Sequence, residues 1–541
     1  MKYIVIDKCE LAFRDDNNEL TDRIFHKGDI IDEEFASKIP QELIERMKQM
    51  QLIIEYHEEK DYIADINDDF WKIIDMKSTE NEEFNENTLK NDEKNSILAQ
   101  AIYDVVPFIY YRNEFYIYEN GIYKRVSDEF VRKLVHDAIS LINMSSKKTY
   151  ISQTKYNYDE VIHLLKSYFY IDKISEELQN YIPLKNKIYD IVSKEAFSYH
   201  EKYIFFSKLN VEYDENAKEC PNFMKFLDDI TEGDEKKKKL ILQMMAYCLY
   251  PNYKYHVFFV LTGAGANGKT TLLNFLTDLL GTENVSNRTL HELAENRFAS
   301  YDLMNKFANI SSELTSKDLR DTTIIKALTG GDWIVGERKF KNPVKFKNFA
   351  KLIFATNQVP KMLEDDSYGL YRRVILIPFT RTFKQEEMDT QMLEKLKSEK
   401  KAVLHILLKE LHELLEKGFV YESDVDKIRE TYNLHASPVE IFFDNYVTYG
   451  VRGCVFSKDI YNAYVDFCKK NKLSACSREA FIKQIRAIIK STGGSLTAKQ
   501  VRVKQVNENY NTREKMLFWI RLEDEYSIYN QDIEIYREYI E

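Results

Sequence analysis

A glycine-rich segment that ends in lysine and threonine carries the clearest chemical signal in this 541-residue sequence. Gly263, Gly268, Lys269 and Thr270 follow the pattern Gly-x4-Gly-Lys-Thr, one residue after the apolar run 257–261. Glycines let backbone N–H groups approach a phosphate, lysine neutralises its charge, and the hydroxyl binds Mg²⁺. The alternative is a glycine-rich turn of an ordinary α/β protein. We predict that ATP with Mg²⁺ binds at Gly263, Ala264, Gly265, Ala266, Asn267, Gly268, Lys269, Thr270 and Thr271.

Two polar residues follow other strand-like runs. Glu313 comes after apolar residues in "KFANISSEL", and Asn357 ends "KLIFATN". A nucleotide hydrolase needs a carboxylate and a water-positioning group at the ends of strands that neighbour the phosphate loop. We therefore predict Glu313 as the base and Asn357 as the residue that holds the attacking water. The alternatives are a glutamate that starts a helix and an ordinary polar strand end.

A pair of arginines precedes another continuous apolar run. Arg372 and Arg373 stand directly before "VILIPF". An arginine supplied by a neighbouring subunit can stabilise the charge that develops during phosphoryl transfer. If the protein is a ring ATPase, we expect one of the two to act in this way. The alternative is a pair of ordinary surface charges.

The segment "GERKFKNPVKFKN", residues 336–348, interleaves basic and aromatic residues around an Asn-Pro turn signal. Such a hairpin can contact the backbone of a single strand and stack on its bases. A solvated edge hairpin that uses lysines against aggregation is the alternative. We predict a DNA contact, with Lys345, Phe346 and Lys347 continuing the pattern. Its principal residues are Arg338, Lys339, Phe340 and Lys341.

The order of these motifs resembles the superfamily 3 helicases of viruses, phages and plasmids, especially the poxvirus-primase and phage/plasmid type. "IPLKNKIYD", "FFSKLNVEYD" and "CPNFMKFLDDI" are similar to the preceding domain of those proteins, so the resemblance covers about residues 97–522. The chain resembles replication initiators of staphylococcal pathogenicity islands. This implies ATP-dependent, 3′-to-5′ unwinding of origin DNA by a homo-oligomeric ring, expected to be a hexamer, in the cytoplasm of a bacterial host.

The resemblance also implies roles for single residues. Glu313 fits the second Walker B acid and Asn357 the sensor, while Lys339 and Phe340 fit the tip of the DNA-contacting hairpin. Many relatives have two adjacent acids, but the first position here is Ser312. Mg²⁺ ligation is thereby left to Thr270 and Glu313, and the division between base and ligand stays open.

The same resemblance implies residues that act on a neighbour's ATP. Arg373 fits the trans-acting finger better than Arg372. Lys326 in "IIKALTGGD" lies where a second trans-acting basic residue is common.

We expect an α/β fold, in which an AAA+-like P-loop ATPase core follows an α+β N-terminal region and precedes a C-terminal winged helix-turn-helix. "DYIADINDDF" is interpreted as a solvated acidic turn rather than a metal site. The predicted parts are a small acidic module (1–77), a linker (78–94), a helicase-associated α+β domain (95–252), the ATPase core (253–384), a helical segment (385–436) and the winged domain (437–541).

The C-terminal part has the pattern of a winged module. Ser457 and Ser477 can each cap a helix, and Gly493-Gly494 turns the chain into an alternating strand, "TAKQVRVKQV". A helix pair followed by a hairpin suits duplex DNA, although a protein-binding module is the alternative. The expected DNA-contacting residues are Arg478, Lys483, Arg486, Arg502 and Lys504.

Charge is distributed unevenly. The net charge is −11, yet residues 1–94 hold 13 Lys and Arg against 26 Asp and Glu, whereas residues 451–522 hold 15 against 5. A basic C-terminal module predicts contact with nucleic acid. The acidic N-terminal module suits a host replication or regulatory protein.

Other features limit the function classes. No apolar run approaches the about 18 residues of a membrane span, so we expect no membrane partner. The six scattered cysteines show no zinc-ligand spacing. A remodelling or packaging ATPase without unwinding activity, or a DNA-binding switch governed by ATP, remains the alternative function.

Overall fold

The computed structural model describes two compact units, whose mutual arrangement is left open. The first unit holds residues 1–117 and 125–172, and the second holds residues 118–124 and 173–541. The described residues are 62–80, 89–147, 149–263, 265–312, 323–339, 341–357, 359–360, 368–504 and 511–531, together with the backbone of short strands between residues 2 and 56.

Four helices share the hydrophobic core of the first unit. Ile66, Phe70 and Ile74 recur on one face of α3 and are buried beside apolar residues of α4, α5 and α6. In the first 56 residues, β1 pairs with β4 and β5, and β2 pairs with β3. The elements are β1 (Lys2–Val5), β2 (Cys9–Arg14), β3 (Leu20–Phe25), β4 (Ile30–Ile31), β5 (Ile53–Tyr56), α3 (Tyr62–Glu80), α4 (Asn91–Val105), β6 (Phe108–Tyr111), β7 (Glu114–Glu119), α5 (Asp128–Ser145) and α6 (Lys155–Tyr168).

Two expectations for this region differ from the structure. "DYIADINDDF" is not a turn, because it belongs to α3, whose apolar residues are buried in the core. The division expected at residue 77 also falls inside α3, and α4 begins within the segment expected as a linker.

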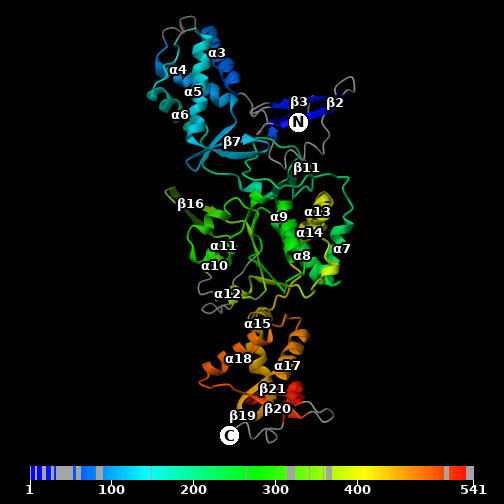
Figure 1. Cartoon of the computed structure of the whole chain (residues 1–541). Coiled ribbons are helices and arrows are strands. Elements are labelled where there is room, and N and C mark those ends of the chain that lie inside the picture. The colour runs from blue at the N-terminus through cyan, green and yellow to red at the C-terminus, as the bar shows by residue number, and fades with distance from the viewer. Residues whose placement is uncertain are drawn as a thin grey trace. The chain divides into compact units, whose positions relative to one another are not determined.

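A parallel sheet of five strands organises the second unit (Figure 1). Its order is β13-β14-β17-β12-β18, so the central β12 pairs with β17 on one side and β18 on the other. The sheet confirms the expected mixed α/β class. Its strands are β12 (Phe258–Thr262), β13 (Val285–Ser286), β14 (Ala308–Ser311), β17 (Lys351–Thr356) and β18 (Val374–Pro378).

Helices cover both faces of this sheet. Phe259 and Leu261 belong to one core cluster with α7, α8, α9 and α14, whereas Phe258 and Val260 belong to a second cluster with α10, α11 and α15. Alternate residues of a strand point to opposite faces, so the continuous apolar runs are buried on both sides. The helices are α7 (Pro221–Thr231), α8 (Glu235–Leu249), α9 (Lys269–Leu280), α10 (Leu290–Glu295), α11 (Thr323–Gly330), α12 (Tyr368–Tyr371), α13 (Met392–Ser398), α14 (Lys400–Lys417) and α15 (Val425–Ala436).

The first long helix after the sheet, α14, ends at Gly418, whose φ of 82° suits glycine. Glu399 separates α14 from the preceding α13. The Glu399 carboxylate accepts hydrogen bonds from the backbone N–H groups of Asn222 and Phe223, at 3.1 and 2.8 Å. The break thus places an acceptor at the start of α7.

The C-terminal part of the second unit packs three helices on an antiparallel sheet. Ser477 caps α18 as expected, because its hydroxyl accepts from the Ala480 N–H at 3.3 Å. The first helix differs, since Ser457 is its first residue and Phe456 holds the N-cap position. The sheet order is β20-β21-β19-β22. The elements are α16 (Pro438–Tyr446), β19 (Val447–Phe456), α17 (Ser457–Lys470), α18 (Arg478–Ser491), β20 (Thr497–Lys504), β21 (Asn511–Leu522) and β22 (Asn530–Gln531).

Smaller strands complete the described elements. A three-stranded antiparallel sheet in the order β11-β10-β9 lies in the second unit, and β15 pairs with β16 in a hairpin. In the sequence, β8 contains the boundary between residue 124, which belongs to the second unit, and residue 125, which belongs to the first. These elements are β8 (Ile122–Val126), β9 (Tyr181–Pro183), β10 (Ile188–Asp190), β11 (Ala196–Phe197), β15 (Trp333–Arg338) and β16 (Lys341–Lys347).

Candidate functional site

The glycine-rich segment connects the central strand of the sheet to a buried helix. β12 ends at Thr262, and α9 begins at Lys269. A Cβ on Gly263 would lie 2.3 Å from the carbonyl oxygen of Phe379, and a Cβ on Gly268 would lie 2.6 Å from a side-chain carbon of Ile230. Both glycines have positive φ, 153° and 83°. Any side chain at either position would displace the loop, so the two glycines are required for its path.

Lys269 lies inside this loop. Its side chain is buried, and its ammonium donates a hydrogen bond to the Gly263 carbonyl oxygen at 2.7 Å. Burial lowers the pKa of Lys269 to about 8. A buried ammonium next to the N-terminus of a 12-residue helix suits an anion, since both the charge and the helix dipole favour it.

The other predicted loop residues differ in exposure. Gly265, Ala266 and Thr270 are exposed, whereas Asn267 is buried and Thr271 is half-buried. The exposed hydroxyl of Thr270 stands in the first turn of α9, where a Mg²⁺ ligand is expected. Ala264 lies outside the described residues.

The ends of three parallel strands meet beside the loop. Thr262 of β12 is in register with Thr356 of β17 and with Pro378 of β18. Asn357 follows Thr356 directly and is exposed. The sheet therefore carries Asn357 to the same edge as the glycine-rich loop. Glu313, the predicted base, lies outside the described residues.

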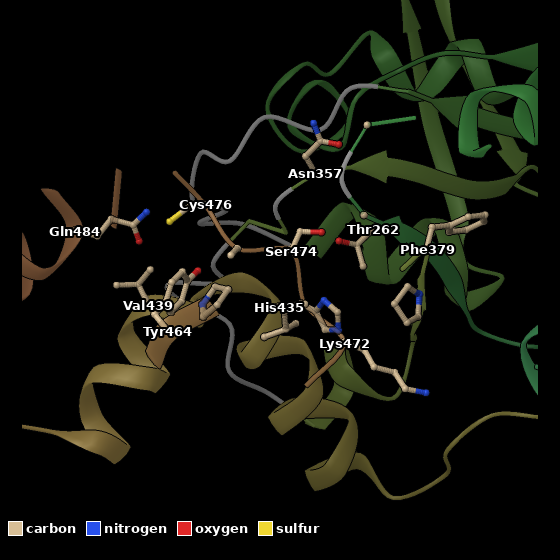
Figure 2. A pocket seen from close by; sticks show the side chains of 16 residues that line it. Thr262, Asn357, Phe379, His435, Val439, Tyr464, Lys472, Ser474, Cys476 and Gln484 are labelled. Atoms are coloured by element: carbon tan, nitrogen blue, oxygen red, sulfur yellow. The ribbon is translucent and has the colours of Figure 1, made fainter. Parts of the chain in front are cut away.

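A cavity of about 330 Å³ opens at this edge of the sheet (Figure 2). Residues from the C-terminal part of the same unit form its opposite side, and Figure 2 shows Ser474 facing the region of Thr262 and Asn357. Burial lowers the pKa of His435 in its wall to about 4, so this imidazole is neutral at pH 7. The lining residues are Thr262, Gly263, Gly265, Asn357, Pro378, Phe379, His435, Pro438, Val439, Tyr464, Lys472, Leu473, Ser474, Ala475, Cys476 and Gln484.

The two arginines lie at the opposite edge of the sheet. Val374 is in register with Phe258, the first residue of β12, so β18 separates Arg373 from the loop edge. Five residues of strand span about 16 Å. Arg373 is 8% exposed and its guanidinium donates to the Gly369 carbonyl, whereas Arg372 is exposed. Neither arginine is placed to reach the phosphate loop of its own chain.

Lys326, the second basic residue expected to act across subunits, is half-buried in α11. This helix ends at Gly330, where a Cβ would lie 3.8 Å from the Arg373 guanidinium. The structure thus places α11 and Arg373 side by side, away from the loop edge.

The basic segment forms the predicted hairpin, β15–β16, with Lys339 exposed in its turn. Arg338 stacks on Tyr301, with its guanidinium carbon 4.9 Å from the ring centroid. Phe346 is 3% exposed, so the expectation that this ring stacks on bases is wrong, because it packs into the core. Phe340 and the side chain of Lys341 lie outside the described residues.

The C-terminal basic residues lie on two elements. Arg478, Lys483 and Arg486 are exposed on α18, whose Phe481 and Ile485 are buried. This is the distribution of a helix with one face toward the core and one basic face toward solvent. Arg502 and Lys504 lie in β20, opposite Arg513 and Asn511.

The described ranges contain no group of three or more His, Cys, Asp or Glu that could hold a metal ion. Within the same ranges, each helix is too short or too polar to span a bilayer.

Family models match two parts of the chain. Residues 261–373 match the model described as "Family of unknown function (DUF5906)", and residues 95–232 match the model described as "D5 N terminal like". The first match runs from the end of β12 to the arginine pair.

A curated protein of Acanthamoeba polyphaga mimivirus, named "Putative helicase L207/L206", is 26% identical over 292 residues. The aligned part is 49% of this chain and 30% of the mimivirus protein. This chain therefore spans less than a third of that relative's length.

Solved structures of the NrS-1 C-terminal region are similar to this chain at a lower sequence identity than the mimivirus protein. Two apo structures have TM-scores of 0.40 and 0.38 and identities of 16% and 17%. They cover 75% and 76% of this chain and 94% and 95% of the NrS-1 chains. These TM-scores are too low to establish a shared fold.

Sequence reasoning missed the C-terminal wall of the cavity. His435 and residues 472–476 stand more than 160 residues from Gly263 in the chain, and their types carry no signal of a nucleotide site. Their place depends on how the C-terminal helices pack on the sheet edge.

Proposed function

We propose that this protein is an ATP-driven helicase that assembles as a ring, expected to be a hexamer, and unwinds origin DNA from 3′ to 5′. The observation that carries the proposal is the division of catalytic groups between two edges of one sheet. Lys269 and Asn357 stand at one edge, and Arg372 and Arg373 at the other. A ring would bring the arginine edge of one subunit to the loop edge of the next. A helicase function is supported by the name of the mimivirus relative and by the match of residues 95–232 to the model described as "D5 N terminal like".

The residues at the loop edge divide the work of hydrolysis. Backbone N–H groups of the loop and the ammonium of Lys269 bind the phosphates, which replace the Gly263 carbonyl as the partner of Lys269. Thr270, together with Glu313 as the second candidate ligand, would hold Mg²⁺, which would neutralise phosphate charge. The carboxylate of Glu313 accepts a proton from the attacking water, and the amide of Asn357 orients that water.

Two elements contact DNA in this proposal. The hairpin, with the exposed Lys339 in its turn and with Phe340 as the other predicted contact, follows a single strand. A winged helix-turn-helix built on α17 and α18 binds the origin duplex. The exposed basic face of α18 supports the second role. We propose that the acidic N-terminal residues bind a host replication or regulatory protein.

A forked-duplex assay tests the proposal. The wild-type protein is expected to separate a fork with a 3′ tail when ATP is present and to fail with a non-hydrolysable analogue. Lys269→Ala removes the phosphate-binding ammonium and should abolish unwinding. The matched control is Lys218→Ala, because Lys218 is an exposed lysine of the same unit that is not among the residues predicted to bind nucleotide or DNA. Unwinding by Lys269→Ala, or by the wild type without hydrolysis, would contradict the proposal.

A nucleotide-controlled DNA-binding switch is the second candidate. The cavity favours it, because α18 supplies Gln484 to the same space that Gly263 and Gly265 line. Single-turnover measurements separate the two candidates. A switch hydrolyses one bound ATP slowly and unwinds nothing, whereas a helicase turns over repeatedly and faster when DNA is present.

A further inference from the structure

The β15–β16 hairpin has two faces of different character. Ile334 and Phe346 are cross-strand partners, 4% and 3% exposed, and belong to the core beside the sheet. Gly336 belongs to the same inner face, where a Cβ would lie 3.1 Å from Phe346 and from Tyr301. This tight packing fixes which face of the hairpin points to solvent.

The outer face combines exposed apolar residues with lysines. Trp333 and Val335 are 63% and 50% exposed, which is unusual for side chains of this size. Their cross-strand partners are Lys347 and Lys345, both exposed. The Lys347 ammonium lies 5.4 Å from the Trp333 ring centroid. We call these four residues the outer hairpin face.

The charges around this face are mainly positive. Lys339 is exposed in the turn at one end of the hairpin, and Asp332 precedes Trp333 at the other end. The carboxylate of Glu337 is already engaged by Arg297, at 3.2 Å. A ligand on the outer face therefore meets lysines along most of its length.

We propose that the outer hairpin face binds single-stranded nucleic acid, with one base stacked on Trp333 and phosphates on Lys345 and Lys347. Stacking needs an accessible ring, which Phe346 cannot supply and Trp333 does. Residues two apart on a strand are about 6.6 Å apart, so the two lysines can contact successive phosphates of an extended strand. This proposal rests on the proposed function and extends the DNA contact from the turn to the whole hairpin.

Fluorescence of the full-length protein tests the stacking. The chain has three tryptophans, Trp71, Trp333 and Trp519. Titration with oligo(dT) is expected to quench the wild-type emission, and Trp333→Phe should remove most of this quenching. The matched control is Trp519→Phe, because Trp519 is also partly exposed, at 38%, but lies in β21. This control should keep the wild-type quenching.

Affinity measurements provide an independent readout. Trp333→Ala should weaken binding of oligo(dT) by about ten- to a hundredfold, the range expected for loss of one stacked base. Lys347→Gln should weaken binding and reduce the slope of log affinity against log salt by about one. Lys218→Gln is the control for the lysine change and should leave that slope unchanged. An unchanged melting temperature verifies that each variant is folded.

Several outcomes would overturn the inference. Quenching that persists in Trp333→Phe, or an oligo(dT) affinity of Trp333→Ala within twofold of wild type, would show that Trp333 does not stack. A changed oligomeric state with unchanged oligo(dT) affinity would identify the face as a contact between subunits. The proposed function is tested separately, since wild-type protein that unwinds a fork while these variants bind normally would refute the outer-face proposal alone.

Discussion

The ammonium of Lys269 donates a hydrogen bond to the carbonyl oxygen of Gly263, 2.7 Å away across the glycine-rich loop. The lysine is thus held by its own loop, in a position where a phosphate oxygen can take over from the carbonyl. Burial lowers the pKa of this lysine to about 8, because the charged form loses contact with water. An anion in the loop would favour the charged form, so we expect binding of the proposed nucleotide to be coupled to protonation of Lys269.

This coupling predicts a pH dependence of nucleotide binding. Above pH 8 the free protein carries a neutral Lys269, and binding must take up a proton. Affinity for a non-hydrolysable ATP analogue should therefore fall as pH rises above 8, by at most about tenfold per pH unit. Calorimetric titrations between pH 7 and 9.5, in two buffers of different ionisation enthalpy, measure both affinity and proton uptake. An arginine stays charged in this range, so Lys269→Arg should show no uptake. Equal wild-type affinity at pH 8 and 9.5 would refute the coupling.

The arginine pair predicts complementation between two inactive variants. The family resemblance favours Arg373 as the trans-acting finger, but the structure exposes Arg372 and buries Arg373 against the Gly369 carbonyl. We therefore predict that Arg372 acts on the neighbour's ATP and that Arg372→Ala loses hydrolysis with an unchanged melting temperature. Arg373→Ala should lower both the rate of ATP hydrolysis and the melting temperature. If an arginine acts on a neighbour's ATP, a mixture of Arg372→Ala and Lys269→Ala proteins contains some interfaces with both residues intact. The mixture should hydrolyse ATP, while each variant alone does not.

Two results would contradict this assignment. Full hydrolysis by Arg372→Ala would leave Arg373 as the acting residue. No recovery in the mixture, when light scattering shows that mixed oligomers form, would argue against any contribution between subunits.

A buried lysine predicts a second pH dependence, of stability. Lys351 is 0% exposed, and its ammonium donates to the carbonyls of Tyr250, of Asn252 at 2.9 Å and of Phe349 at 2.8 Å. The ring centroid of Tyr247 lies 4.6 Å from the same ammonium. Burial lowers the pKa of Lys351 to about 7. The unfolded chain, with a lysine pKa of about 10.4, binds more protons above pH 7.

The free energy of unfolding of the wild type should therefore rise with pH relative to that of a variant without the ammonium. Lys351→Met is expected to be less stable overall, since three carbonyls lose their donor. Between pH 7 and 10 the wild type should gain up to about 1.4 kcal/mol per pH unit over this variant. Scanning calorimetry of both proteins checks the difference in melting temperature. A constant difference across this range would show that Lys351 keeps its charge in the fold.

The pattern of apolar residues over short stretches of sequence was sufficient to predict the strands around the loop. The apolar runs before Gly263, before Asn357 and after Arg373 are strands of one sheet, because residues buried on both faces must be apolar throughout. The Ser477 cap and the Gly418 terminus were likewise readable, since capping depends on a few adjacent residues.

The acidic stretch in α3 shows where pattern was insufficient. Asp65, Asp68 and Asp69 suggested a solvated turn, but Ile66 and Phe70 between them lie in the core of the first unit. Helical spacing places these apolar residues on one face, yet only the presence of a packing partner makes that face form.

The sequence by itself determined that a glycine-rich loop joins a buried strand to a helix, that a polar residue follows a neighbouring strand and that a basic hairpin precedes that strand. Only the tertiary structure decided that Trp333 rather than Phe346 faces solvent, and that Arg372 and Arg373 stand about 16 Å along β18 from the loop edge. The physical reason is the distance along the chain over which each effect acts. Strand, turn and cap preferences act over a few residues, whereas exposure and reach depend on which distant segments pack together.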